Sequence, residues 1–354
     1  MKKNSYHIIG VMSGTSLDGV DLCYVNFRLK KNWDYNILNT ITYKYSDEWK
    51  NRLLNATNLD KSNLDKLDIE YTNLLISLIK EFILKFRIDK VDSICSHGHT
   101  VFHKPNKGFT FQIGNLPELA IGLNLTVVCD FRIQDVELGG QGAPLVPIGD
   151  KLLFPKYDYC LNLGGFSNIS YKNIEEIKAY DVCPVNCVLN YYCNIIGLDY
   201  DNEGLIAESG KIDLKLLNEL NSIEYYKSNM PKSLGIEWVT EIIFNKINQN
   251  NLSTADILRT YCEHISIQIA NAIKNDSSSI FITGGGAKNK FLIKLIKDRI
   301  NNPIIIPDNE IVDFKEALIF GFLGVLKLRG EINCLKSVTG ANNDHSSGVI
   351  YKII

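Results

Sequence analysis

Apolar and polar positions along this chain follow two different periods. Residues 63–87 carry apolar side chains at helical spacing, among them Leu67, Tyr71 and Leu74, and this pattern predicts an amphipathic helix. Short apolar runs bounded by glycine, proline or polar residues predict strands. We expect strands or hairpins at 6–12 with 20–28, 91–97, 109–114, 125–131, 157–173 and 279–289, and further helices at 117–124, 184–196, 253–274, 290–299 and 314–329. Such alternation is typical of an α/β protein.

Two of the predicted hairpins, at 7–27 and 157–173, have a similar layout. In each, a buried strand delivers small and polar residues into a tight turn. The chain has 354 residues, which exceeds the size at which one hydrophobic core stops growing, so two domains are expected. The repeated layout indicates two related halves, with coincidence as the alternative.

Composition narrows the function classes. The chain is 45% hydrophobic and 22% charged, with a net charge of −2. The chain has no surplus of basic residues that would favour binding to nucleic acid or to an anionic membrane. The N-terminal apolar run is shorter than that of a signal peptide, and no apolar run approaches the ~18 residues of a membrane span. The nine cysteines form no CxxC pair, so we expect reduced thiols and a cytoplasmic protein.

The turn of the first hairpin combines small, hydroxylic and acidic residues. Glycine and hydroxyl groups allow a backbone to approach an anion closely. The carboxylates of Asp18 and Asp21 would repel a phosphate unless a divalent cation lay between them. The turn therefore predicts a phosphate-plus-metal loop without the lysine of a Walker A motif, and a hairpin turn that merely needs Gly and Asp is the alternative.

Two later loops offer donors without a carboxylate. The turn in "LNLGGFSNIS" contains Gly164, Gly165, Ser167 and Asn168, and "ITGGGAKN" places three glycines between a strand and a helix. A helix N-terminus after such a loop favours an anion, but the loop lacks the GxGxxG spacing of dinucleotide-binding proteins. Taken singly, each is also compatible with an ordinary turn.

Nine motifs, in order, resemble those of one family. They are "GVMSGTSLDGVDL", "SHGHTVFH", "FQIGN", "DFRIQDVELGGQGAPLVP", "LNLGGFSNIS", "YDVCPVN", "PKSLG", "GGGAKN" and "SVTGA", and they run from residue 10 to 341. Together they are similar to the 1,6-anhydro-N-acetylmuramate kinases of the actin, Hsp70 and sugar-kinase superfamily.

The resemblance implies a fold and an activity. The fold is the two-domain actin-like ATPase (ribonuclease-H-like) α/β fold with an interdomain cleft, with domain I at 1–135 plus 313–354 and domain II at 136–312. The activity is hydrolytic opening of the 1,6-anhydro bridge and phosphorylation of O6 by ATP with Mg²⁺, in peptidoglycan recycling. A homodimer is also implied.

The resemblance also assigns roles to residues. The catalytic residues are Asp181 and Glu316. The ATP-binding residues are Gly14, Thr15, Ser16, Leu17, Asp18, Gly19, Val20, Asp21, Gly164, Gly165, Ser167, Asn168, Gly284, Gly285 and Gly286. The substrate-binding residues are His97, Thr100, Arg132, Gln141 and Asn186, and Asp18 is the metal residue, holding Mg²⁺ through ATP.

Local chemistry leaves alternatives open. Asp181 precedes Pro184, a good first helical residue, so it is either a base whose pKa a helix N-terminus keeps low or a simple helix cap. Glu316 is either a residue near the sugar or an acid in the first turn of the last helix. Arg132 either binds the lactyl carboxylate of the sugar or pairs internally with Asp130 or Asp135.

Three histidines and three cysteines raise the question of a metal. His97, His99 and His103 lie close in sequence, but no Cys or acid completes a zinc set. Cys183, Cys187 and Cys193 are better explained as helix-face thiols than as redox or metal residues. The family more often has Gly at position 183 and Gln at position 99, so this chain departs from the pattern at Cys183 and His99.

Two other functions compete with this one. The nearer is a kinase of the same superfamily that acts on another sugar or small acid. The more distant is a non-catalytic ATP switch like actin or Hsp70. The long motif at 130–147 resembles a substrate site and speaks against the switch.

Overall fold

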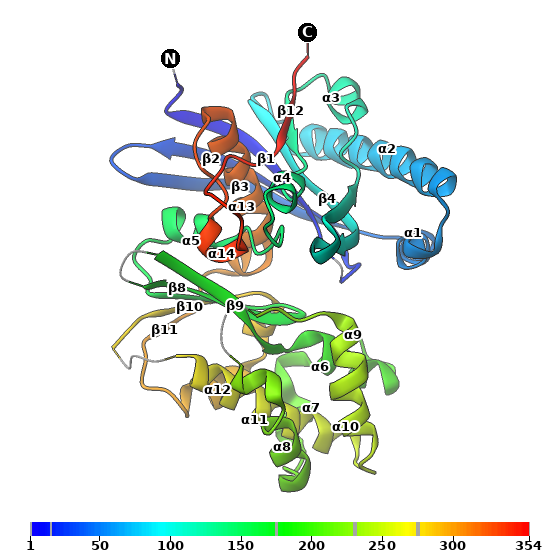
Figure 1. Cartoon of the computed structure of the whole chain (residues 1–354), viewed down its shortest axis with the longest axis vertical. Helices are drawn as coiled ribbons and strands as arrows, with labels where there is room; N and C mark the ends of the chain where they lie inside the picture. Colours follow the sequence, from blue (N-terminus) through cyan, green and yellow to red (C-terminus); the bar gives the residue numbers. More distant parts are fainter. Residues whose placement is uncertain (1, 15, 174–175, 229–231, 274–276, 354) are drawn as a thin grey trace. The chain divides into compact units, whose positions relative to one another are not determined.

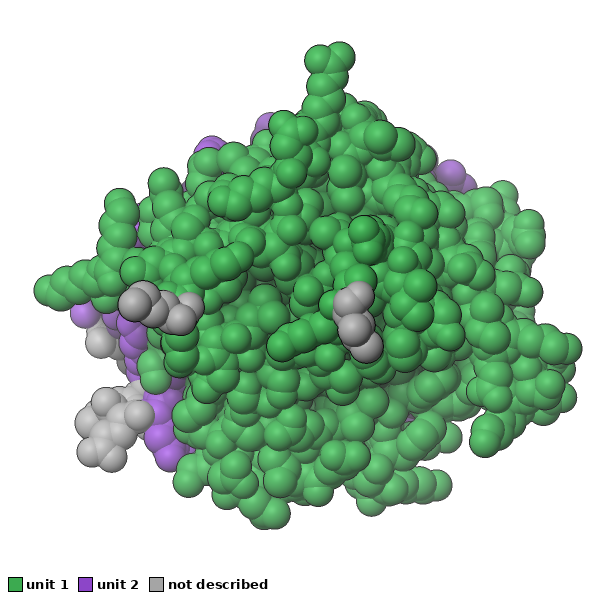
Figure 2. All heavy atoms as spheres, turned by 90° about the horizontal axis from the view of Figure 1, so that it is seen from above, with its two compact units in different colours: residues 1–155, 314–354 green, residues 156–313 purple. Residues whose placement is uncertain are grey.

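The computed structural model describes residues 2–14, 16–173, 176–228, 232–273 and 277–353. The chain forms two compact units, unit 1 with residues 1–155 and 314–354 and unit 2 with residues 156–313, which Figure 2 distinguishes by colour. The expected boundary at 135/136 lies too early. Residues 136–155 belong to unit 1 because α5 (Pro147–Leu153) packs on β3 (Trp33–Lys44) and Lys315 forms an ion pair with Asp150 over 2.8 Å.

Unit 1 is built on a mixed sheet in the order β12-β6-β4-β1-β2-β3, with β5 paired to β4. The first three strands are antiparallel neighbours, whereas β4 and β6 run parallel to β1. The other strands are β1 (Ser5–Ser13), β2 (Gly19–Leu29), β4 (Ser93–Lys104), β5 (Phe109–Ile113), β6 (Val127–Cys129) and β12 (Val349–Tyr351). Figure 1 shows α2 lying along this unit.

Unit 2 repeats this strand order in a smaller sheet, β11-β10-β7-β8-β9. Its strands are β7 (Tyr159–Leu163), β8 (Phe166–Asn173), β9 (Glu176–Pro184), β10 (Ile280–Thr283) and β11 (Ile304–Ile305). Here too an antiparallel set of three strands is followed by two parallel ones. The expectation of two related halves, each opening with a hairpin, is confirmed, and the repeated order is that of the expected actin-like fold.

The helices have the following bounds. In unit 1 they are α1 (Asp47–Leu54), α2 (Lys61–Lys85), α3 (Glu118–Leu123), α4 (Ile133–Glu137), α5 and α14 (Lys336–Thr339); α13 (Asn309–Arg329) begins at the end of unit 2 and continues into unit 1. In unit 2 they are α6 (Asn186–Ile195), α7 (Leu205–Ser209), α8 (Leu214–Asn221), α9 (Ile236–Trp238), α10 (Asn245–Asn248), α11 (Thr254–Ala272) and α12 (Lys290–Lys297). Short 3₁₀ or π turns occupy Ala56–Asn58, Pro105–Lys107, Asn202–Gly204, Glu224–Lys227, Val239–Phe244 and Gly285–Lys288.

Apolar burial explains why these elements pack as they do. The predicted stripe of α2 buries Leu67, Tyr71 and Leu75 in the core of unit 1. On β1, Gly10 lies so close to the α13 backbone that a Cβ atom there would collide with the carbonyl of Ala317. A glycine at this position therefore lets the helix approach the sheet. Among the described residues, no helix is long and apolar enough to span a membrane.

Candidate active site

The first candidate loop joins β1 to β2. Ser16 and Asp18 are exposed in it, and Leu17 adopts a left-handed φ of 58°. Gly14 is half-buried and its carbonyl accepts a hydrogen bond from the backbone N–H of Leu17 over 3.4 Å. Thr15 lies outside the described residues. The loop thus offers one exposed hydroxyl and one exposed carboxylate next to an irregular backbone, as a phosphate-plus-metal loop requires.

The last three predicted ATP residues of this hairpin have roles within the sheet. Gly19 faces the backbone of Tyr43 too closely for a Cβ atom, and Val20 is fully buried. The Asp21 carboxylate accepts a hydrogen bond from Thr42 over 2.5 Å. Packing therefore explains the glycine at position 19 and the valine at position 20, and the candidate ATP groups lie in the turn before them.

A buried polar chain lies beneath this turn. Ser13, the last residue of β1, bonds Tyr45 over 2.7 Å and the Nδ1 atom of His99 over 3.0 Å, and Tyr45 bonds Tyr71 in turn. Burial lowers the pKa of His99 to about 4, so its ring is neutral at neutral pH. His99, a departure from the family pattern, thus supports the base of the hairpin.

Arg132 contacts His97, another candidate substrate residue of unit 1. Its Nε atom donates to Nε2 of His97 over 2.8 Å, and its Nη1 atom donates to the carbonyl of Gly142 over 2.6 Å. The Nδ1 atom of His97 lies 2.8 Å from the carbonyl of Gly98, so the ring is a neutral Nδ1–H tautomer. Burial and the nearby guanidinium hold the pKa of His97 well below its usual range. The zinc alternative for the histidines is not supported, because both ring nitrogens of His97 and the Nδ1 atom of His99 already form hydrogen bonds.

The internal salt bridge considered for Arg132 is not found among the described residues. Asp130 instead accepts from the amide of Asn115 over 3.0 Å, and burial raises the pKa of Asp130 to about 6. Asp135 accepts from the backbone N–H of Gly142 over 2.7 Å. The Nη2 atom of Arg132 has no hydrogen-bond partner in the described part of the chain, so it can meet a carboxylate ligand.

Glu316 lies in the interior of α13, not at its start. The helix begins at Asn309, so the alternative that Glu316 is an acid of the first turn is wrong. Burial raises the pKa of Glu316, whereas the charges of Arg132 and Lys315 lower it. In unit 1 a half-buried acid therefore lies near the arginine that contacts His97.

The other two predicted substrate residues of unit 1 are Thr100 and Gln141. The Thr100 hydroxyl accepts from the amide of Gln112 over 3.4 Å. Gln141 has an exposed side chain, and its backbone N–H donates to the carbonyl of Thr339 over 2.8 Å. Only the side chain of Gln141 is therefore plainly accessible.

In unit 2 the two predicted donor loops come together. The amide of Asn186, at the start of α6, donates to the carbonyl of Leu163 over 3.1 Å, and its backbone N–H bonds the carbonyl of Gly164 over 3.2 Å. A Cβ atom on Gly284, which has a φ of +84°, would lie 2.5 Å from the side chain of Asn162; one on Gly286 would lie 2.8 Å from Leu163. Glycine at positions 284 and 286 is thus required by the close approach of the end of β7.

Ser167 has a structural role that was not expected. Its buried hydroxyl donates to the carbonyl of Cys183 over 3.0 Å and accepts from the same residue's backbone N–H over 3.2 Å. The hydrogen bonds of its hydroxyl are therefore satisfied by Cys183 in β9, which does not support the predicted role of Ser167 in ATP binding. The Cys183 thiol lies 3.3 Å from this hydroxyl, so the cysteine that replaces the family's glycine is accommodated inside the sheet.

Asp181 lies beside an irregularity in β9. The register with β8 shifts between Ser167, opposite Cys183, and Asn168, opposite Asp181, which leaves Val182 as an extra residue. Such bulges re-aim neighbouring side chains and are frequent next to active sites. Pro184 ends β9 and does not open the following helix, so the alternative that Asp181 is a simple helix cap is wrong.

The loop that contains Leu234, together with Tyr225, holds Asp181 in place. Its Oδ2 atom accepts from the backbone N–H of Leu234 over 2.9 Å, and its carbonyl accepts from the Tyr225 hydroxyl over 2.6 Å. The Lys232 ammonium donates to the carbonyl of Tyr225 over 3.1 Å and lies 4.7 Å from that ring's centre. Lys232 and Leu234 belong to "PKSLG", which carried the family resemblance but no predicted site residue.

The protonation of Asp181 differs from the expectation. Burial raises its pKa to about 6, and the hydrogen bond from Leu234 only partly opposes this. The expected lowering by a helix N-terminus is wrong, because the carboxylate lies within β9 and its hydrogen bond comes from the loop. A carboxylate with a pKa near 6 is ionised at neutral pH yet basic enough to take a proton from water.

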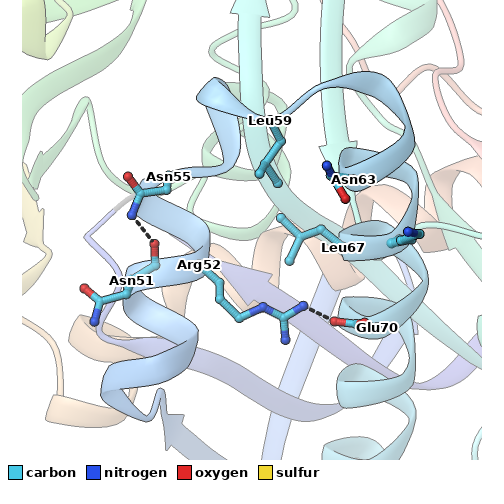
Figure 3. Close-up of a pocket in the computed structure, with 8 residues that line it drawn as sticks. Asn51, Arg52, Asn55, Leu59, Asn63, Leu67 and Glu70 are labelled. Carbon is cyan, nitrogen blue, oxygen red and sulfur yellow. Dashed lines mark hydrogen bonds and ion pairs between the residues drawn. The ribbon is translucent and has the colours of Figure 1, made fainter.

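A separate pocket of unit 1 contains none of the predicted site residues. It has a volume of about 450 Å³ and opens between α1 and the first half of α2 (Figure 3). Arg52 and Glu70 form an ion pair across it, and the guanidinium lies 4.3 Å from the ring centre of Trp49. The charges of Arg52 and Glu70 in this pocket thus neutralise each other.

Comparison with known proteins agrees with the motifs. The family model for anhydro-N-acetylmuramic acid kinase matches residues 6–353. The anhydro-N-acetylmuramic acid kinases of Sulfurimonas denitrificans and Mannheimia succiniciproducens are 33% and 34% identical, covering 97% and 99% of this chain and 99% and 100% of their own lengths. Among solved structures, the activator of 2-hydroxyisocaproyl-CoA dehydratase from Clostridium difficile with bound ADPNP is 12% identical, with a TM-score of 0.41 over 91% of this chain and 97% of that chain.

Proposed function

The chain belongs to the anhydro-N-acetylmuramic acid kinase family, and we propose that Asp181 is the base that activates water in its reaction. The reaction opens the 1,6-anhydro bridge of 1,6-anhydro-N-acetylmuramate and phosphorylates O6, giving N-acetylmuramate 6-phosphate and ADP. The single observation that carries the proposal is the Asp181 carboxylate itself, half-buried beside a bulge, held by the backbone N–H of Leu234, and with its pKa raised to about 6.

The proton and electron movements follow from this role. Asp181 takes a proton from water as the water oxygen attacks the anomeric carbon. The bond between that carbon and the bridging oxygen breaks, and its electron pair stays on O6. O6 then attacks the γ-phosphorus of ATP, and ADP leaves. Positioning and charge stabilisation supply most of the rate enhancement in such phosphoryl transfers.

We assign the nucleotide to two sets of residues. In unit 1 they are the backbone of Gly14, the Ser16 hydroxyl and the Asp18 carboxylate. In unit 2 they are the backbone of Gly164, Gly165 and the Gly284–Gly286 turn, with Asn168 beside Asp181. Gly165 and Gly285 are exposed, and glycine backbone of this kind suits phosphate oxygens, since no side chain intervenes.

Asp18 fits the Mg²⁺ that accompanies ATP. Its carboxylate is exposed, and no hydrogen bond or ion pair to it is found among the described residues. Hard oxygen donors of this kind, with phosphate oxygens and water, are what Mg²⁺ prefers. When bound, the ion would neutralise charge on the phosphates.

We assign Arg132 to the lactyl carboxylate of the sugar. His97 and Gly142 fix two of its nitrogen atoms, which orients the guanidinium before any ligand arrives. A planar, oriented guanidinium suits a carboxylate. Glu316, whose charge partly offsets that of Arg132, belongs to the same sugar site. We further propose that the protein is a cytoplasmic homodimer, as its family resemblance implies.

The decisive experiment measures the mass of the product. Wild type and Asp181→Asn are incubated with 1,6-anhydro-N-acetylmuramate, ATP and Mg²⁺ in heavy-oxygen water, with Asp199→Asn, an exposed acid of unit 2, as the matched control. The expected product is a ring-opened sugar phosphate with one heavy oxygen from wild type and control, and none from Asp181→Asn. Phosphorylated sugar lacking the heavy oxygen would refute water activation. Sugar-independent ATP hydrolysis by the wild type, with no sugar phosphate, would favour a switch.

A further inference from the structure

Three residues from distant parts of unit 1 meet in a buried cluster outside the proposed site. Asp135 lies in α4, Cys334 precedes α14, and His345 follows it; both helices are labelled in Figure 1. They are 0%, 2% and 6% exposed. The Sγ atom of Cys334 lies 3.0 Å from Oδ1 of Asp135, and Nε2 of His345 lies 3.5 Å from the same oxygen.

The orientation of the imidazole ring leaves a polar atom unsatisfied. Nδ1 of His345 lies 3.1 Å from the carbonyl of Asn343, and because a carbonyl only accepts, Nδ1 carries the hydrogen. In the neutral ring, Nε2 is then an acceptor, and it has no hydrogen-bond partner in the described part of the chain. It faces a carboxylate, which is also an acceptor. Two buried acceptors that face each other require either a proton or a cation between them.

We propose that Asp135, Cys334 and His345 bind a divalent transition-metal ion, zinc by the chemistry of its ligands. A carboxylate oxygen, a thiolate and an imidazole nitrogen are all established zinc ligands, and three protein ligands leave one position for water. The separations of 3.0 and 3.5 Å are close to those of neighbouring ligands around one tetrahedral ion. Binding transfers the thiol proton of Cys334 to solvent, as metal coordination by cysteine requires.

The surroundings supply the outer hydrogen bonds that metal ligands usually have. Thr339 donates to Oδ1 of Asp135 over 2.7 Å, and the backbone N–H of Gly142 donates to Oδ2 over 2.7 Å. Cys334 and His345 face each other across a bridge of two backbone hydrogen bonds of 3.1 Å each. Each ligand side chain is therefore oriented before the ion arrives.

The site has a structural consequence for the chain. The ion would join the segment at 334–345 to the loop at 135–142. The same loop contains Gly142, whose carbonyl accepts from Arg132. Metal binding would thus stabilise the loop that orients Arg132, although the inference itself does not depend on the proposed reaction.

Cobalt titration tests the proposal. The full chain is stripped with a chelator, titrated with Co²⁺ alone and followed by absorption, then challenged with Zn²⁺. We expect one Co²⁺ per chain, a thiolate-to-cobalt charge-transfer band in the near ultraviolet, and loss of that band on zinc addition. Cys334→Ser should abolish the band, and His345→Gln should weaken binding at least about tenfold. Cys262→Ala, which removes a buried thiol of unit 2, should leave the band unchanged.

Three outcomes would overturn the proposal. The first is saturating cobalt without a thiolate band, which places the ion at carboxylates such as Asp18. The second is a band that persists in Cys334→Ser. The third is a metal-free protein whose His345 carries protons on both ring nitrogens at neutral pH by ¹⁵N NMR and which takes up no Co²⁺, because the imidazolium would then satisfy Asp135. Cys334→Ser keeps a hydroxyl donor toward Asp135, and circular dichroism checks that each variant is folded.

Discussion

Replacement of Asp181 by asparagine should stabilise the protein while removing its activity. The pKa of Asp181 is raised by burial from 3.8 to about 6, so the ionised carboxylate is less stable in the folded protein than in the unfolded chain. About two pKa units correspond to about 3 kcal/mol at pH values above both pKa values. Asparagine carries no charge and its carbonyl oxygen can still accept from Leu234, so it avoids this penalty.

The sign of the pH dependence follows from the direction of the shift. A raised folded-state pKa means that the folded protein binds the proton more tightly than the unfolded chain. The stabilising contribution is full below about pH 4 and is lost as the pH rises through about 6. The advantage of Asp181→Asn should therefore be small at pH 4, grow between pH 4 and 6, and reach up to about 3 kcal/mol at pH 7.5.

Urea denaturation of wild type and Asp181→Asn across pH 4–8 measures this difference. A spectroscopic signal from unit 2 is preferable, because a two-unit chain need not unfold in one step. For a unit of this size, about 3 kcal/mol equals roughly 6–12 °C in melting temperature. Asp199→Asn, at an exposed position, should show no such trend. If Asp181→Asn is no more stable than wild type at pH 7.5, or if its advantage does not change with pH, the carboxylate is not desolvated and its assignment as a tuned base fails.

Three further substitutions probe the assigned groups. Lys232→Met keeps the apolar stem of the side chain but loses the hydrogen bond to the carbonyl of Tyr225. We expect kcat to fall about tenfold with little loss of stability, because the loop that holds Asp181 is less firmly fixed. An unchanged kcat would contradict this. Gly165→Asp fits sterically, since the nearest atom to a Cβ at this position lies 4.0 Å away, and its added negative charge should raise the KM for ATP about tenfold. Gly165→Asn, which adds a side chain of similar size without the charge, should not raise this KM. Equal effects of the two substitutions would argue against a phosphate at this position. Arg132→Met should raise the KM for the sugar at least about tenfold, a loss that Arg132→Lys does not restore because lysine lacks the planar fork; full activity of either variant would remove Arg132 from the sugar site.

Periodicity predicts the long helices and most of the strands, but it misses short helices such as α1 and α8 and also strands that are irregular. The alternation of β3 is interrupted at Leu38, because Ile37 and Asn39 pair with consecutive residues of β2 and leave Leu38 as a bulge. This strand was not predicted. β9 was also missed, and Val182 is its extra residue. A bulge shifts the period of two by one residue, so a pattern search sees two short fragments instead of one strand.

The candidate site was predictable only in part, for a related reason. Glycines at turns are visible in the sequence because few residues replace them, and the motifs around Asp18, Gly165 and Gly284 were found in this way. Contacts between distant segments leave no such trace. The approach of Leu234 to Asp181 joins residues 53 positions apart, and nothing in either segment's composition reveals it.

The repeated topology places the two loops that we propose for the nucleotide at equivalent positions in their units, although their chemistry differs. Both units place a turn between their first two antiparallel strands, next to a parallel strand. The fold therefore fixes where each turn lies within its unit, and the side chains of the turn determine which ligand group it can bind. The first turn exposes the Asp18 carboxylate, whereas the second presents only backbone and Gly165. A phosphate with a bound cation suits the first turn, and a phosphate oxygen without a cation suits the second. Moving the carboxylate from the first turn to the second should therefore weaken nucleotide binding, although both hairpins keep their shape.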